Sequence, residues 1–188
     1  MLRFLLGLIS GLVALALIAV GWFWFGKVPV AVFDAPLPYE GQIVSIPLHA
    51  RIHKEMIKAP PIPVDEDNLL AGAHVYAEKC SVCHGFYGKP STYGVHMNPS
   101  APQLWEKQPK STVIGVSDDP PGETYWKVSN GIRLTGMPSY KMILTPTEVW
   151  QVSLLLANAD KPLPPAALDL LRGAEPGPPV VVPTPRKK

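Results

Sequence analysis

Cysteine and charge are both scarce in this sequence. Its 188 residues include two cysteines, and only 17% of the residues are charged, with a formal net charge of +2. A disulfide between Cys80 and Cys83 would close a loop too small to stabilise much. Two cysteines are also too few for a structural zinc site, which needs about four Cys or His ligands at paired spacing. No basic cluster resembles the surface of a nucleic-acid binder, so we expect no nucleic-acid partner.

Apolar residues and prolines are abundant by contrast, and they are unevenly distributed. Hydrophobic residues make up 47% of the chain, which has 23 prolines. From Asp65 to Asp160 there are seven Lys and Arg against ten Asp and Glu, so this middle part is mildly acidic. The length suits one domain with appendages. We therefore expect four segments: a transmembrane anchor (1–27), a proline-rich linker (28–64), one domain (65–160) and a proline-rich, flexible tail (161–188).

The longest apolar run predicts a membrane-spanning helix. Phe4 to Phe25 contain no charged residue, and a helix of that length spans about 33 Å, close to the roughly 30 Å hydrocarbon core of a bilayer. Aromatic residues crowd its C-terminal end at positions 22–25, as at a membrane–water interface. The apolar region of a cleaved signal peptide is usually only about 7 to 15 residues long. We favour a retained anchor, with cleavage near Ala16 or Ala19 as the alternative.

The linker contains seven prolines, which keep the residues before them extended, so we interpret it as a tether or an arm lying on the domain. His49 and His53 would share a face if residues 48–57 form a short helix. A metal site there would need two more ligands from elsewhere. We therefore interpret these histidines as solvated or packing side chains.

The most informative motif is Cys80-Ser81-Val82-Cys83-His84. Two cysteines two residues apart, followed at once by histidine, form the attachment pattern for haem c, in which both thiols bond the porphyrin and the histidine ligates iron. A thioredoxin-like redox pair would need a βαβ context. Here an amphipathic stretch precedes the motif and a loop rich in glycine and proline follows it, which argues against that alternative.

Helix signals surround this motif. Asp65 or Asp67 can cap a helix reaching about Cys80, whose buried face would include Leu69, Ala73 and Tyr76. Further helices are expected at 123–130, closed by a left-handed glycine at 131, and from a capping box at 145–148 to about 157.

Together these features resemble the class I cytochromes c. Gly72 and Tyr76 stand eight and four residues before Cys80, like the glycine and aromatic residue of that family's first helix, where the glycine permits close approach of the last helix. The resemblance further implies that Trp150 is the aromatic partner at this crossing. It covers residues 65–160 and implies an all-α class I cytochrome c fold, here preceded by a single N-terminal transmembrane helix.

The resemblance also implies further site residues. Residues 98–104 look like the family's Pro-x-Leu segment, in which a proline carbonyl accepts a hydrogen bond from the ligand histidine; we assign Pro102, with Pro99 as a competitor. Met137 lies in a Gly-x-x-x-x-x-Met-Pro loop, so His84 and Met137 are the expected iron ligands. The competing methionines are Met97, Met142 and Met56. Trp126 is assigned to a haem propionate through its indole N–H, with simple packing as an equal alternative.

This resemblance implies a function as well. We expect one covalent haem c and one-electron transfer between redox proteins outside the membrane, with no small-molecule substrate and no enzymatic activity, because both axial positions would be filled. Haem is attached to such motifs on the outer side of the bacterial membrane, so the domain is expected in the periplasm, with the helix in the inner membrane. The alternatives are a subunit of a larger oxidoreductase complex, a haem sensor or enzyme with an open iron site, and a binding module without haem.

Overall fold

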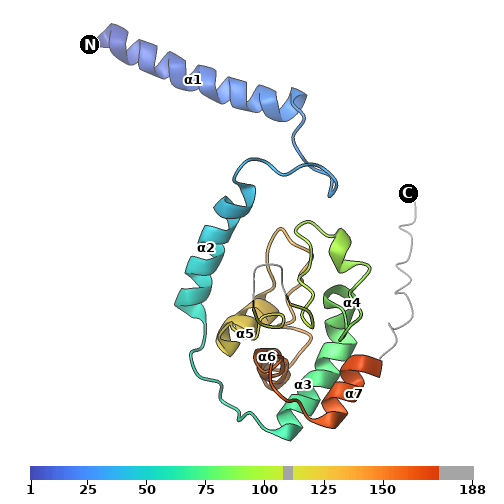
Figure 1. Cartoon of the computed structure of the whole chain (residues 1–188). Coiled ribbons are helices and arrows are strands. Elements are labelled where there is room, and N and C mark those ends of the chain that lie inside the picture. Colours follow the sequence, from blue (N-terminus) through green and yellow to red (C-terminus); the bar gives the residue numbers. More distant parts are fainter. Residues whose placement is uncertain (108–111, 174–188) are drawn as a thin grey trace, which may run out of the picture. The chain divides into compact units, whose positions relative to one another are not determined.

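The computed structural model describes residues 1–107 and 112–173 and divides the chain into two units, 1–42 and 43–188. Helices dominate both, and within the described residues β-structure is limited to isolated bridges. Figure 1 labels the helices in chain order. The all-α fold with one N-terminal apolar helix is confirmed.

The first unit consists chiefly of α1 (Leu2–Phe25), a helix of 24 residues with no Asp or Glu and a single Arg near its start. It is long and apolar enough to cross a membrane, and none of its central stretch is buried against protein. Lipid is the natural solvent for such a surface, because exposed apolar side chains of this extent are unfavourable in water. The helix is therefore compatible with the predicted transmembrane anchor.

Two helices with well-defined caps form the centre of the second unit. In α3 (Glu66–Lys79) the Asp65 side chain accepts a hydrogen bond from the Asn68 backbone, and in α6 (Pro146–Ala157) Thr145 and Glu148 form the predicted capping box. The two helices cross closely at Gly72, where a Cβ atom would collide with the Gln151 carbonyl of α6. The expected close approach at Gly72 is thus confirmed. The short helices α4 (Ser81–His84) and η1 (Gly94–His96) follow α3, and α5 (Pro121–Asn130) packs against α6.

The aromatic residues pair differently from the prediction. The Tyr76 ring meets Trp105 edge to face at 5.4 Å, whereas Trp150 stacks on Tyr125 at 4.3 Å. Trp150 is therefore not the partner of the crossing at Gly72. It points from α6 toward α5, because the α3 face of α6 is occupied by the close backbone contact.

The tail prediction was wrong for residues 165–173, which form α7 (Pro165–Gly173) packed against α3. Ala167 and Leu171 lie four residues apart on one face and are fully buried in the main core. Pro165 suits the first turn of a helix, where no backbone donor is needed. Burial of this apolar face outweighs the breaking effect of the neighbouring prolines. Residues 174–188, the end of the predicted tail, lie outside the described residues.

The linker is more helical than expected, because α2 (Glu40–Glu55) runs through its middle. Pro47 lies inside this helix. Ile52 is fully buried, and the Glu55 carboxylate accepts a hydrogen bond from the Trp126 indole at 2.9 Å. The C-terminal end of α2 is thereby attached to the domain, so the interpretation as an arm on the domain applies to this part of the linker.

Candidate functional site

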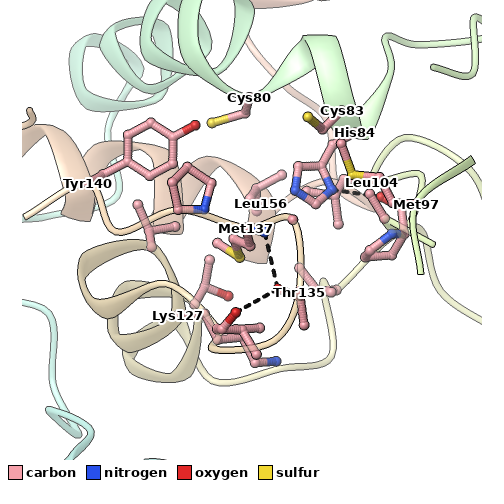
Figure 2. Close-up of a pocket in the computed structure, with 18 of the residues that line it drawn as sticks. Cys80, Cys83, His84, Met97, Leu104, Lys127, Thr135, Met137, Tyr140 and Leu156 are labelled. Atoms are coloured by element: carbon pink, nitrogen blue, oxygen red, sulfur yellow. Dashed lines mark hydrogen bonds between the residues drawn. The ribbon is translucent and has the colours of Figure 1, made fainter. Parts of the chain in front are cut away.

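An open, mainly apolar cavity lies in the second unit and brings most of the predicted site residues together. Figure 2 shows Cys80, Cys83, His84 and Met137 around it. Apolar side chains from α5, α6 and the segments before and after α5 complete the wall, among them Leu104, Val116, Val128, Ile132, Val152 and Leu156. Segments far apart in the sequence thus converge on one cavity.

The two cysteines lie on one side of this cavity and are both unbridged. Burial, with the nearby Cys83 as a smaller contribution, raises the pKa of Cys80 to about 12. Burial raises the pKa of Cys83 as well. Redox-active cysteines need a lowered pKa, because the thiolate is the nucleophile. This environment is therefore unlike a thioredoxin-type site and suits uncharged thioether links.

The His84 ring is oriented by a backbone carbonyl. Its Nδ1 lies 2.8 Å from the Pro102 oxygen, and because that oxygen can only accept, Nδ1 must carry the proton. Burial lowers the pKa of His84, although the hydrogen bond to Pro102 acts in the opposite direction. A neutral ring protonated at Nδ1 has its lone pair at Nε2, the form in which histidine ligates a metal.

Met137 lies in a tight loop that is stabilised by hydrogen bonds between its own residues. The Thr135 hydroxyl donates to the Ile132 carbonyl at 2.7 Å and accepts from the Met137 backbone N–H at 3.1 Å, and the Ile132 N–H donates to the Met137 carbonyl. Gly131 ends α5 with φ of +68° and lies against Pro138, where a Cβ would be 2.7 Å from the proline carbonyl carbon. Only glycine combines this backbone conformation with so close a contact.

The competing methionines occupy different places. Met97 also lines the cavity, with its sulfur against Gly136, so it remains beside Met137 as a second thioether. Met142 is 93% exposed, and Met56 lines a separate pocket. The arrangement favours Met137 or Met97 over the other two.

The structure does not bring Trp126 to the cavity. Its indole N–H donates to Glu55, and the ring lines the separate pocket next to α2. The assignment of Trp126 to a haem propionate is thus corrected: its donor faces α2 because adjacent residues of α5 point in different directions around the helix.

Several polar residues that line the cavity were not assigned to it from the sequence, among them Lys127, Thr135 and Tyr140. Tyr140 donates its hydroxyl hydrogen to the Lys79 carbonyl at 2.8 Å, and burial raises its pKa to about 12. Thr135 two residues before Met137 is a recognisable local signal, because a Thr hydroxyl often accepts from the backbone N–H two positions on. The spacing of Glu123 and Lys127 on α5 is also a signal, for an ion pair along a helix.

The residues of this cavity fit a covalently bound haem. Two adjacent thiols, an imidazole with Nδ1 held by a carbonyl and a thioether face one apolar space, a donor set that suits iron in a c-type site. No three His, Cys, Asp or Glu side chains gather as a metal-binding group anywhere in the described part of the chain, His49 and His53 included.

A helical domain built around such a cavity defines the class I cytochromes c. Comparison with protein families agrees: residues 67–154 match the family described as cytochrome c oxidase, cbb3-type, subunit III, and this part of the chain belongs to the class I cytochrome c family. A comparison with curated proteins found no match. The domain therefore has a haem-dependent electron-transfer role.

Proposed function

We propose that the chain is a membrane-anchored cytochrome with one haem c, bonded to Cys80 and Cys83 and ligated by His84 and Met137. The observation that carries this proposal is the convergence of these four side chains on one apolar cavity, with His84 oriented by the Pro102 carbonyl. Haem c held there would supply reversible one-electron transfer between Fe(III) and Fe(II).

The protein's own residues define the conditions for that transfer. The apolar wall excludes water, which limits solvent reorganisation around the site. The Pro102 carbonyl fixes the imidazole and strengthens it as a donor, and the Thr135 hydrogen bonds hold the loop that presents Met137. With histidine and a thioether as ligands, an iron held there would favour the reduced ion and have a raised potential.

The proposed partners are redox proteins on the outer side of the bacterial inner membrane. The domain would meet them while α1 anchors the chain in that membrane. The family description of residues 67–154 favours a second candidate, in which the chain is the electron-transfer subunit of a membrane oxidoreductase. In both cases the chain carries electrons and binds no small-molecule substrate.

Visible spectra of the full chain in detergent, oxidised and reduced, test the site. We expect a c-type spectrum and a weak iron–sulfur band near the red end in the oxidised state, which disappears in Met137→Ala and persists in Met142→Ala. Loss of the band in Met97→Ala alone would transfer the assignment to Met97. Absence of covalent haem after expression with the maturation system would overturn the proposal.

Purification in mild detergent separates the two candidates. A stable set of copurifying membrane subunits would identify a complex subunit. Isolation of the chain alone, with electron transfer to oxidised membranes on re-addition, would identify a free carrier.

A further inference from the structure

Two charged side chains interrupt the apolar wall of the cavity, Lys79 and Lys127, and Lys127 is the more buried of the two. Lys127 of α5 lines it, and its side chain is only 23% exposed. Its Nζ lies 2.7 Å from Glu123 Oε1 and 3.0 Å from Asp119 Oδ2, and the Glu123 side chain is only 10% exposed. Charges removed from water to this degree are costly, so a cluster of this kind needs close hydrogen bonding.

The cluster keeps Lys127 charged. Burial alone lowers the pKa of Lys127, but the hydrogen bond to Glu123 and the charge of Asp119 outweigh it and raise the pKa above its ordinary value. An ammonium has three N–H donors, and two acceptors are found for Nζ among the described residues, Asp119 and Glu123. One donor is left for a further acceptor.

The position of Lys127 indicates which acceptor that is. Figure 2 shows Lys127 on the side of the cavity away from Cys80 and Cys83, with Met137 between. Haem carries its two vinyl groups on one edge and its two carboxylates on the opposite edge. If the cysteines bind the vinyl edge, the carboxylate edge faces the side where Lys127 lies.

We propose that Lys127 binds a haem carboxylate through its remaining N–H, with Asp119 and Glu123 as positioning residues for the ammonium. This inference rests on the proposed function. The contact with a haem carboxylate, which the sequence assigned to Trp126, is thereby transferred to Lys127, the next residue in the chain. The alternative is a purely structural ion pair, which stabilises the first turns of α5 and has no effect on the haem.

The two alternatives differ in the midpoint potential. A positive charge near iron disfavours the oxidised form, so its removal lowers the potential, whereas removal of a nearby negative charge raises it. Spectroscopic redox titration at pH 8 of the full chain in detergent should show a downward shift for Lys127→Met, a native value for Lys127→Arg and an upward shift for Glu123→Gln. A purely structural ion pair would lower the stability of these variants without opposite shifts in potential.

Lys161→Met is the matched control, because Lys161 donates to Asn158 at 3.0 Å and does not line the cavity. Native potentials in both Lys127→Met and Glu123→Gln would overturn the proposal. If Lys127→Met does not fold, an unchanged potential in Glu123→Gln alone is sufficient to overturn it. The mass of the wild-type chain is measured first: absence of covalent haem there would refute the proposed function itself, whereas a loaded wild type with unshifted variants refutes only the role of Lys127.

Discussion

At the scale of single residues, several polar side chains at or near the cavity are satisfied by main-chain carbonyls. Tyr76 donates to Gly85, His84 to Pro102, Tyr140 to Lys79, and Thr135 to Ile132. A neutral side chain paired with a neutral carbonyl introduces no net charge into a medium where charges are costly. The two lysines that line the cavity differ, because they are paired with carboxylates: Lys79 with Glu78, and the more buried Lys127 with Asp119 and Glu123.

Tyr76→Phe tests one of these pairs. The Tyr76 hydroxyl donates to the buried Gly85 carbonyl at 2.7 Å, directly after the Cys-x-x-Cys-His segment. The substitution leaves this acceptor without its partner, so we expect a loss of about 1–3 kcal/mol in the free energy of unfolding. Denaturant unfolding followed by circular dichroism measures it. Tyr93→Phe is the control, because Tyr93 is 60% exposed, and an equal loss there would contradict the explanation.

Thr135→Val tests the loop that presents Met137. Valine matches the shape of threonine but lacks the hydroxyl that joins Ile132 to Met137. We expect a loss of roughly 1–2 kcal/mol in loop stability, which increases the open population about tenfold. The measurement is carbon monoxide binding to the reduced protein, which should become faster in Thr135→Val and stay near native in Thr135→Ser. Identical kinetics in all three proteins would show that the hydroxyl does not hold the loop.

At the scale of helices, the position of the site depends on the α3–α6 crossing. Cys80 directly follows α3 and the rest of the haem motif forms α4, whereas Val152 and Leu156 of α6 line the cavity. A shift between these two helices would therefore move the cysteines relative to the part of the wall that α6 provides. The absence of a side chain at Gly72 is what lets them approach so closely.

Gly72→Ala should therefore be destabilising although alanine is the better helix former. The gain in helix propensity is about 1 kcal/mol, whereas the new Cβ would collide with the Gln151 backbone, and overpacking costs typically about 1–3 kcal/mol. Thermal unfolding should show a lower midpoint. Gly41→Ala in α2 is the control, because nothing lies within 4 Å of its Cβ position, and we expect no loss there. An unchanged midpoint for Gly72→Ala would mean that the helices can separate at little cost.

Features that depend on neighbours in sequence were predictable, and features that depend on distant contacts were not. The caps at Asp65 and Thr145 and the glycine at 131 were found because their partners lie within a few residues. The helix α7 was missed because its stability comes from burying Ala167 and Leu171 on a helix almost a hundred residues earlier.

The same limit applies to the site. The cysteines and His84 were recognisable from one short motif, and their convergence with Met137 was expected only through a family resemblance. Whether Trp126 or Lys127 faces the cavity depends on how α5 is rotated about its axis. That rotation is determined by α6 and by the Glu55 contact, neither of which leaves a local pattern.

At the scale of the whole molecule, the apolar helix is suited to lipid and the haem domain to water. The helix α1 spans about 36 Å at the usual rise, enough for a bilayer core of roughly 30 Å. The full chain should remain in membranes after an alkaline carbonate wash, and a version starting at residue 28 behind a cleavable signal should be soluble. A mature wild-type chain that begins after Ala16 or Ala19 and is recovered in the soluble fraction would show a cleaved signal instead.

If α1 is retained, its main effect on function is to raise the effective concentration of the domain near partners in the same membrane. A domain held by a short tether meets partners in the same membrane at an effective concentration on the order of millimolar, because the encounter is confined to a small volume. The soluble version should therefore transfer electrons to oxidised membranes much more slowly at micromolar concentration, and should approach the native rate only as its concentration rises toward that range. The midpoint potential of both versions should be the same, which separates loss of tethering from damage to the site. Equal rates at micromolar concentration would mean that the domain binds its partner tightly without the anchor, as an assembled subunit would.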